Sequence, residues 1–382
     1  MKTALFYKYD LKDARMEIVY DNIIFALQQY GGISVVWSEL LKRQQEDGTL
    51  DIKYLDVTHT DNYARKRLPI PDERIIGNIS SPVISRYLPV RISCDKPFLF
   101  HSSYYRYCSH AKAINITTVH DFTYELFYSG MKKAVHSWQK SKAIRHSDCI
   151  VCISESTKRD LLRFLPDVDE SKVSVVYNGV SDEFRILNEH DGDAMLPYPS
   201  QTFVVFIGKR EPYKNFHLVL KGVSKTGLNL LIVGKPLSPQ EQHEIEQLIP
   251  KEKYLCLGHV NDKELNRLYN HAKALVYPSS YEGFGLPVLE AQKAGCPVIA
   301  YAASSIPEVI GSTPMLMKEL TVTELVTKLR LLDNKQLMTE VRNAGLANSQ
   351  AFSWEKTHQS YLKLYQEAYR RKVSKISQFI RF

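Results

Sequence analysis

The fold of this 382-residue chain is decided by one stretch, Ala274-Leu-Val-Tyr-Pro-Ser-Ser-Tyr-Glu-Gly-Phe-Gly-Leu-Pro-Val-Leu-Glu-Ala-Gln-Lys-Ala-Gly-Cys-Pro-Val-Ile-Ala-Tyr301. It begins with a short apolar run that is typical of a buried parallel strand. A loop with two glycines follows, and Pro287 suits the first turn of a helix that Gly295 can close. A second apolar run ends the stretch. The order of strand, glycine loop, helix and strand predicts a parallel sheet.

The loop of this stretch presents backbone amides together with two carboxylates. The first amides of a helix have no partner within it, so those from Phe284 to Leu286 suit an anion. Glu282 precedes the helix, and Glu290 lies within it, with seven residues between the two. Acids near a helix start are common for capping alone, but this pair flanks a loop at the carboxyl end of a strand, where open α/β sheets bind ligands. The pair is therefore predicted to bind hydroxyls of a sugar or ribose while the amides hold phosphate.

The segment from Glu282 to Glu290 resembles the Glu-x7-Glu signature of a large retaining glycosyltransferase family. That family, the family 4-like enzymes, includes bacterial mannosyl- and glucosyltransferases and relatives of sucrose and glycogen synthase. The resemblance implies an α/β fold of GT-B architecture, with two facing Rossmann-like domains, parallel sheets and a cleft between them. The expected division is an N-terminal acceptor domain (1–182), a linker (183–200), a nucleotide-sugar donor domain (201–355) and a C-terminal helix that returns to the first domain (356–382).

Length and composition fit this architecture. The chain is long enough for two domains, and its 44% apolar and 24% charged residues are typical of a globular protein. Charged residues interrupt the apolar run of the first ten residues, so we expect a strand there and not a signal peptide. No apolar segment approaches the roughly 18–20 residues that cross a bilayer, and a cytoplasmic location is expected. The Cys-x-x-Cys at Cys149 and Cys152 falls in a strand-like run, so its thiols should face opposite sides and hold no metal.

Two basic clusters contribute to the net charge of +8. The first surrounds Trp138 and comprises Lys132, Lys133, Lys140, Lys142 and Arg145. The second lies near the C-terminus and comprises Arg370, Arg371, Lys372, Lys375 and Arg381. Two interpretations stay open: a solvated helix face, or peripheral contact with an anionic membrane on the inner face of the plasma membrane. Nucleic acid is not an expected partner, because no DNA- or RNA-binding signature is present.

Two motifs of the first half match the family by resemblance. Gly31-Gly32 lies before a helical pattern, at the place where the family has a glycine-rich loop facing the donor's phosphates. His120 ends an apolar strand, and the family has a histidine there that contacts the transferred sugar near its reactive carbon. His120 is therefore a candidate catalytic residue, without assignment as a general base. Ser154 or Ser156 is expected to cap the helix that follows, and neither is a site candidate.

The second half places basic residues after its first strand. The family has a basic residue just after the strand's glycine and a lysine five positions later, which here are Lys209 and Lys214. The first is usually arginine in the family, so the choice between Lys209 and Arg210 as diphosphate ligand stays open. A lysine near a departing diphosphate stabilises charge that grows in the transition state. The family's Gly-Gly-x-Pro-Glu turn has Ser304 and Ser305 in place of both glycines, which leaves the path of that loop undecided.

The expected function is that of a retaining, metal-independent glycosyltransferase without a cofactor. It would move a hexose, preferably mannose from GDP-mannose, to a glycan or lipid-linked acceptor in cell-surface polysaccharide synthesis. The resemblance makes His120, Glu282 and Lys214 the catalytic candidates. The donor-binding candidates are Gly31, Gly32, Lys209, Arg210, Lys214, Phe284, Gly285, Leu286 and Glu290. The alternatives are another donor such as UDP-glucose, a nucleotide-sugar epimerase or hydrolase, and a non-catalytic sugar-nucleotide-binding subunit. An oxidoreductase is disfavoured because no Gly-x-Gly-x-x-Gly opens either half.

Overall fold

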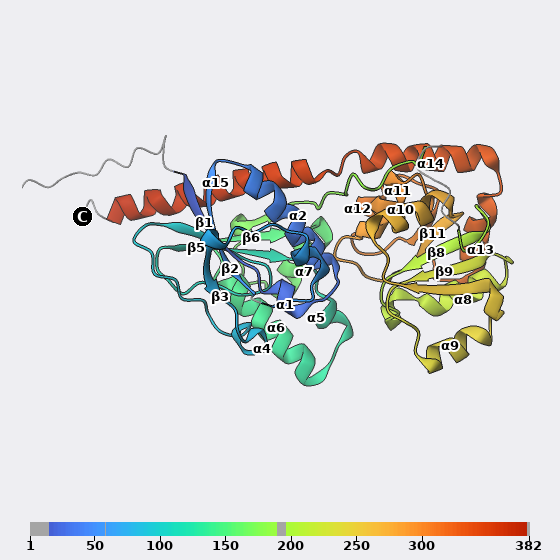
Figure 1. Ribbon diagram of the computed structural model, residues 1–382, viewed down its shortest axis with the longest axis horizontal. Helices are drawn as coiled ribbons and strands as arrows, with labels where there is room; N and C mark the ends of the chain where they lie inside the picture. Colours follow the sequence, from blue (N-terminus) through green and yellow to red (C-terminus); the bar gives the residue numbers. More distant parts are fainter. Residues whose placement is uncertain (1–14, 58, 189–195, 380–382) are drawn as a thin grey trace, which may run out of the picture.

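The computed structural model describes residues 15–57, 59–188 and 196–379, which form two α/β units along the long axis of the molecule (Figure 1). The strand predicted within the first ten residues lies outside the described residues. Each unit contains one sheet in which every pairing is parallel. The predicted GT-B arrangement of two Rossmann-like domains is confirmed.

The first sheet has seven strands. Their order is β3 (Ile75–Asn78), β2 (Leu50–Asp56), β1 (Met16–Asp21), β4 (Phe98–Ser102), β5 (Ala113–Val119), β6 (Cys149–Cys152) and β7 (Val173–Val175). The central strands β4 and β5 are buried at every position, as expected of a sheet with both faces covered. The chain crosses from β1 to β4 after building one edge, and this reversal marks where open sheets bind ligands.

Helices cover both faces of the first sheet. One face packs against α2 (Gly32–Glu46) and α15 (Trp354–Phe379), and the other against α6 (Gly130–Arg145) and α7 (Glu155–Phe164). Cys149 belongs to the core under α15, and Cys152 to the core under α7. The predicted opposite orientation of these two thiols is confirmed. The shorter helices of this domain are α1 (Ile24–Leu27), α3 (Tyr63–Lys66), α4 (Pro82–Ser85) and α5 (Thr123–Phe127).

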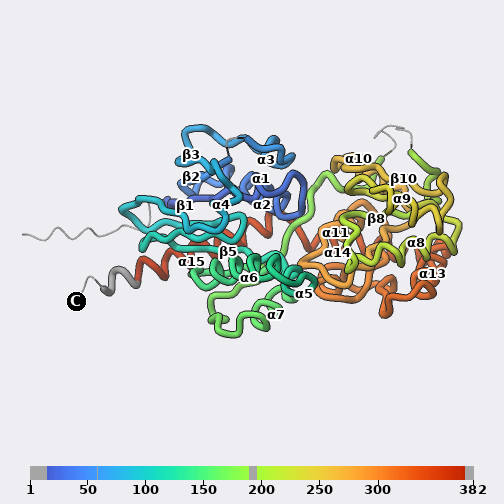
Figure 2. The backbone as a smooth tube through the Cα atoms, turned by 90° about the horizontal axis from the view of Figure 1, so that it is seen from below, coloured from blue at the N-terminus to red at the C-terminus, as the bar shows by residue number. Residues whose placement is uncertain are grey.

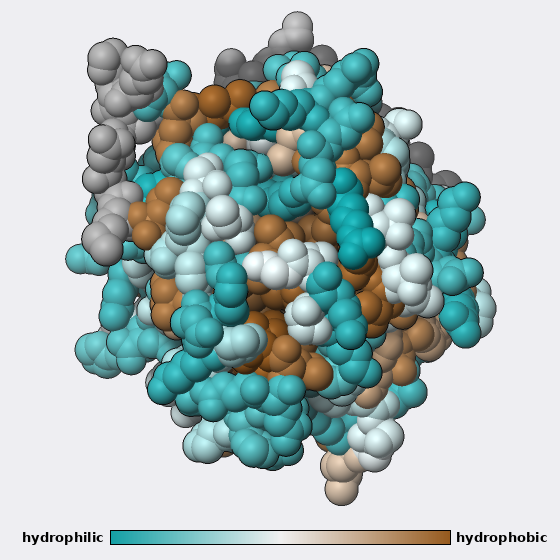
Figure 3. All heavy atoms as spheres, turned by 90° about the vertical axis from the view of Figure 1, so that its right-hand side faces the viewer, coloured by the Kyte–Doolittle hydropathy of each residue, from teal (hydrophilic) through white to brown (hydrophobic). Residues whose placement is uncertain are grey.

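The second sheet has six strands, in the order β10 (Tyr254–Gly258), β9 (Asn229–Val233), β8 (Phe203–Ile207), β11 (Ala274–Tyr277), β12 (Val298–Tyr301) and β13 (Leu316–Met317). Its helices are α8 (Phe216–Ser224), α9 (Pro239–Glu246), α10 (Asp262–His271), α11 (Leu286–Lys293), α12 (Ile306–Ile310), α13 (Val322–Leu331) and α14 (Lys335–Ser349). Seen end-on, this domain shows apolar side chains between hydrophilic ones (Figure 3). The stretch 274–301 folds as predicted, into β11, α11 and β12.

Helix α15 ties the two domains together. It begins where Val180 bridges to Ser353, and a Cβ on Gly179 would lie 2.1 Å from the Trp354 nitrogen, so the chain crosses there in close contact. The helix then runs along the first domain, where Tyr361 and Tyr365 are buried (Figures 1 and 2). The Tyr365 hydroxyl lies 2.7 Å from Nδ1 of His101. Among the described residues, no helix combines the length and apolar character needed to cross a bilayer.

Candidate active site

The loop between β11 and α11 is docked against the strand ends of the first domain. A Cβ on Gly283 would lie 1.9 Å from the His120 carbonyl oxygen, so only glycine allows this approach. The Gly283 carbonyl accepts hydrogen bonds from Ser154 Oγ at 2.7 Å and from Thr157 Oγ1 at 3.2 Å. Ser154 also caps α7, as predicted, by accepting from the Thr157 amide. The carboxyl ends of β5 and β6 therefore hold the loop that carries Glu282.

Tyr281 is a second contact between the domains, and it was not predicted. Its hydroxyl donates to Asp160 Oδ2 at 2.7 Å and accepts from the Phe122 amide at 2.9 Å. Burial and the neighbouring Asp160 carboxylate raise the pKa of Tyr281 well above its usual range, so the hydroxyl keeps its proton. Its place directly before Glu282 was the one hint that the sequence offered.

Glu308 is the third contact. Its carboxylate accepts from the amides of Glu155 and Ser156 at 2.9 Å each, so a side chain of the second domain caps α7 of the first. It also accepts from the Tyr177 hydroxyl at 2.9 Å. The Tyr177 hydroxyl thus supplies a hydrogen bond between the two domains.

The structure brings together Lys214 and Glu282, two of the predicted catalytic residues. They form an ion pair, and each side chain is only 12% exposed. Lys214 lies in a 3-10 turn that Asn215 pins to the loop after β11, donating to Pro278 O and Ser280 Oγ at 2.8 Å each. The ammonium also lies 5.3 Å from the centre of the Tyr277 ring. A cation is thus held beside the start of α11.

Glu290 lies on α11 in surroundings that disfavour its charge. Burial and the nearby Asp262 carboxylate raise its pKa to about 8, and the Tyr269 hydroxyl donates to its Oε2 at 3.4 Å. The carboxyl is therefore protonated at neutral pH in the unliganded protein. A neutral carboxyl can both donate and accept a hydrogen bond, which suits a ribose hydroxyl.

The two serines that replace the family's glycines support the Glu282 loop. Ser304 adopts the left-handed conformation that glycine favours, with φ of 48°, and its hydroxyl accepts from the Glu282 amide at 2.8 Å. Ser305 Oγ lies 2.9 Å from the carbonyl oxygens of both Glu282 and Phe284. Ser304 thus adopts a backbone conformation typical of glycine, and the two hydroxyls hold the Glu282 loop.

The first domain also meets the second beside Gly31 and Gly32, the predicted phosphate-facing loop. Gly31 is the N-cap of α2 and Gly32 its first residue. The preceding Tyr30 lies over His259 of the second domain, with ring centres 3.8 Å apart. The segment before the glycine loop therefore contacts the loop that follows β10 in the second domain. Gly285, the N-cap of α11, has φ of 103°.

His120, Lys209 and Arg210 differ in their burial and in the number of their side-chain partners. His120 is buried, and burial together with the Lys140 charge lowers its pKa although Asp121 opposes this, so it is neutral at pH 7. The Arg210 guanidinium is held by Glu241 at 2.6 Å and by the carbonyls of Lys235 and Pro236 at 3.0 Å each. Lys209 is exposed and has no side-chain partner in the described part of the chain. The geometry favours Lys209 over Arg210 as the free cation.

The basic cluster around Trp138 was predicted to lie on the surface, but one of its lysines is buried. Lys140 is buried, donating to Glu125 Oε2 and to Asp121 O at 2.7 Å each. Arg145 forms an ion pair with Asp167. The C-terminal cluster begins on α15, across the sheet from α6, so the two clusters do not share one face (Figure 1). Lys375 and Arg381 lie outside the residues whose side chains are described.

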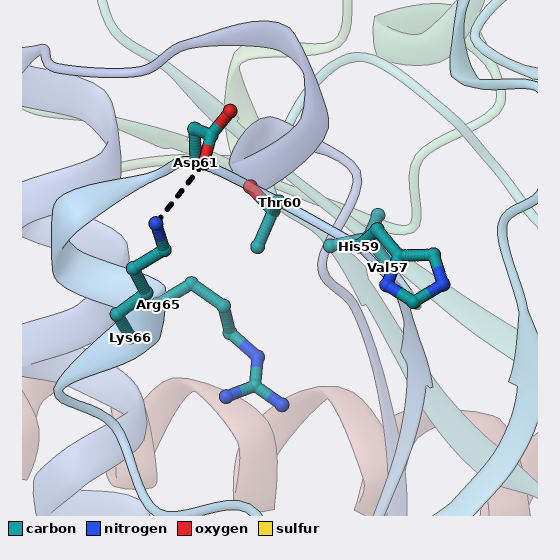
Figure 4. Close-up of a pocket in the computed structure, with 6 residues that line it drawn as sticks. All are labelled: Val57, His59, Thr60, Asp61, Arg65 and Lys66. Atoms are coloured by element: carbon teal, nitrogen blue, oxygen red, sulfur yellow. Dashed lines mark hydrogen bonds and ion pairs between the residues drawn. The ribbon is translucent and has the colours of Figure 1, made fainter.

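A cavity of about 480 Å³ opens beyond the end of β2, in a segment for which the sequence predicted no function. Figure 4 shows its lining, which is Val57, His59, Thr60, Asp61, Arg65 and Lys66. Lys66 pairs with Asp61 at 3.0 Å, and Arg65 pairs with Asp56, so the charges are compensated. In the described ranges, no three His, Cys, Asp or Glu side chains are grouped to hold a metal ion.

Comparison with known proteins identifies the family. Residues 30–184 match the model "Glycosyltransferase Family 4", and residues 193–347 match "Glycosyl transferases group 1". The chain belongs to this glycosyltransferase family, and it is a glycosyltransferase. The boundary between the two matched segments falls within the predicted linker, so each segment contains one of the two sheets.

Relatives of known name agree with this assignment. An O-antigen chain mannosyltransferase B of Escherichia coli is 27% identical over 68% of this chain and 72% of that protein. The serotype-specific mannosyltransferase WbdA of Escherichia coli is 24% identical, over 57% of this chain but only 28% of its own length. Among solved structures, Anabaena HepE in complex with UDP and glucose has a TM-score of 0.68 at 14% identity, covering 92% of this chain and 100% of that one. Sucrose-phosphate synthase from Thermosynechococcus elongatus has a TM-score of 0.69 at 17% identity, covering 94% and 100%. At these identities the structures bear on the fold alone.

Proposed function

We propose that the chain moves a hexose from a nucleoside diphosphate sugar to a glycan or lipid-linked saccharide, with retention of configuration and without a metal. The observation that carries the proposal is the Lys214–Glu282 pair, held at the start of α11 and next to the contact of Gly283 with His120. A cation and a carboxylate are thus paired near the helix amides of α11, and the loop that carries them contacts the backbone of His120. Groups of this kind can stabilise the negative charge that develops on a departing diphosphate.

The leaving diphosphate gathers negative charge as the glycosidic bond breaks. Lys214, with the amides of Gly285 and Leu286, would stabilise that charge, and the exposed Lys209 would extend the binding site. Glu282 would then release Lys214 and accept hydrogen bonds from the sugar hydroxyls. His120, being neutral, would hydrogen-bond the same sugar from the first domain. Glu290 would hold the ribose.

Mannose from GDP-mannose is the preferred donor. The support is the sequence similarity to O-antigen mannosyltransferases, of which the RfbU protein of Salmonella typhimurium is 31% identical over 48% of this chain. The complex of HepE with UDP and glucose concerns a protein of the same fold and makes UDP-glucose the donor to compare. Cell-surface polysaccharide is the expected product.

The proposal is tested by incubating the purified protein with GDP-mannose or UDP-glucose and a panel of lipid-linked acceptors, with and without EDTA. Transfer with retained anomeric configuration, measured by NMR of the product, is the expected result. Lys214→Ala should lower turnover by about 10²–10³-fold, the size of effect seen when one group that stabilises a developing negative charge is removed. Lys221→Ala, which removes an exposed lysine of α8, is the matched control.

Three outcomes would contradict parts of the proposal. Wild-type turnover in Lys214→Ala would remove the assigned role of the lysine. Release of free nucleotide and free sugar at the same rate without acceptor would favour a hydrolase. Loss of transfer in EDTA, restored by a divalent cation, would show that the reaction needs a metal.

A further inference from the structure

Helix α6 is oriented with its apolar side outward. Residues at helical spacing of four and three, Met131, Val135 and Trp138, are exposed, Met131 at 82% and Trp138 at 51%. On the side facing the domain, the same part of the helix is polar, with the buried His136, Gln139 and Lys140, and the apolar Ala143 and Ile144 are buried only near its C-terminal end. Amphipathic helices of globular proteins normally place the apolar stripe against the core. The exposed apolar stripe of α6 is therefore a candidate surface for binding a partner.

Helix α4 and the turn after it extend this surface. Val83 is 73% exposed and Ile84 64%, and Leu88 is exposed as well. Gln139 of α6 donates to the Arg86 carbonyl at 2.8 Å and accepts from the Arg86 guanidinium, so the two elements are joined. Leu88 and Trp138 line one shallow hollow between them. We call this surface the α4–α6 face; it consists of Val83, Ile84, Leu88, Met131, Val135 and Trp138.

The charge around the α4–α6 face has one sign. Residues 79–94 and 126–147 contain no aspartate or glutamate. Lys132 is exposed at the N-terminal end of α6, and Lys142 lies with its ammonium 4.8 Å from the Trp138 ring centre. Two acids near α6 are engaged elsewhere, Glu125 by Lys140 and Asp167 by Arg145. Lysines thus border an apolar surface, and the two sequence segments that form this surface contain no carboxylate.

We propose that the α4–α6 face docks on a lipid bilayer containing anionic lipid. Apolar side chains with an aromatic residue at their centre enter the boundary between headgroups and acyl chains, while lysines beside them bind anionic headgroups. A second copy of this chain is a poorer occupant, because facing copies would bring their lysines together. The face adjoins α5, whose Phe127 stacks on Tyr213 of the second domain at 4.8 Å between ring centres. Docking therefore brings the seam between the domains close to the bilayer.

Trp138 provides a direct test, because the other two tryptophans are buried. Trp37 and Trp354 are each 3% exposed, so a change of fluorescence on adding vesicles reports Trp138. With vesicles of phosphatidylcholine and phosphatidylglycerol, we expect a blue shift of the emission and sedimentation of the protein with the lipid. Trp138→Phe should abolish the blue shift and leave sedimentation in place. No sedimentation with these vesicles would overturn the proposal.

Substitutions separate the apolar and the charged contributions. The double substitution Ile84→Glu and Met131→Glu should weaken vesicle binding by more than tenfold, whereas Leu331→Glu, at an exposed leucine of the second domain, should not. Lys132→Ser and Lys142→Ser should each weaken binding about fivefold, the effect of one lysine near an anionic surface. Equal binding to pure phosphatidylcholine vesicles would overturn the role of anionic lipid.

Two further measurements keep the alternatives distinct. Light scattering should show the same mass for wild type and the double variant. A dimer that the double variant loses, without vesicle binding by wild type, would assign the face to self-association and overturn the proposal. Nucleotide release from a soluble donor should be unchanged in the double variant, which shows that the fold is intact and separates membrane docking from the proposed catalysis.

Discussion

Glu290→Gln should make the unliganded protein more stable at alkaline pH, and the gain should grow with pH. The folded protein raises the pKa of Glu290 to about 8 from its ordinary 4.5. Between these values the folded chain holds a proton that the unfolded chain releases, so the wild type loses stability as pH rises through this window. Each unit of pKa corresponds to about 1.4 kcal/mol, so the full displacement is about 5 kcal/mol. Because the residue as a whole is only half-buried, solvent screens part of this displacement, and we expect about 2 kcal/mol.

Glutamine has the shape of the neutral carboxyl and no titration, so the variant should lack this pH dependence. A gain of about 2 kcal/mol corresponds to about 4–8 °C in the melting temperature of a domain of this size. The assay is thermal unfolding of wild type, Glu290→Gln and the exposed control Glu244→Gln at a series of pH values from 5 to 9. The difference between Glu290→Gln and wild type should increase up to pH 8 and then level off. Parallel curves for the two proteins over the whole range would refute the reasoning.

Three further predictions concern a buried ion pair, the cap of α7 and the Glu282 loop. Lys140→Met should lower the free energy of unfolding by about 3–5 kcal/mol, because Glu125 is left as an unpaired buried charge; chemical denaturation measures this, and recovery in a double variant with Glu125→Gln is the internal check. Glu308→Gln should cost about 1–2 kcal/mol and raise solvent exchange at the start of α7, measured by hydrogen exchange of the Glu155 and Ser156 amides; unchanged protection there would contradict the cap. Ser305→Ala should cost about 1 kcal/mol and lower transfer, since it frees the Glu282 loop, and wild-type transfer by the variant would contradict this.

Much of the fold could be predicted from the sequence because its signals are local. The run from Ala274 to Tyr301 contains a strand, a helix start with proline and a second strand, and each of these signals depends on neighbouring residues. The opposite orientation of Cys149 and Cys152 follows likewise from the period of a strand. The pairing of Lys214 with Glu282 was expected only in the sense that both belong to one site.

What could not be predicted depends on contacts between distant residues. Lys140 looks like any other lysine of a basic helix, and only the position of Glu125 and the strand end makes it a buried partner. Arg210 and Lys209 are adjacent and equally basic, and Glu241 separates their roles. The outward stripe of α6 has a helical period that ordinarily indicates a core. Periodicity shows that a helix has an apolar side but does not tell which way that side faces.

The seam between the two halves has a consequence for recombining this protein with its relatives. Tyr281 donates a hydrogen bond to Asp160, and Glu308 accepts from Tyr177 and from the first amides of α7. Gly283 packs closely against the backbone carbonyl of His120. Every one of these partnerships joins residues encoded far apart. A chimera that keeps one half and takes the other from a homologue inherits half of each partnership, so compatible halves must be chosen at these positions before any choice is made at the sugar site.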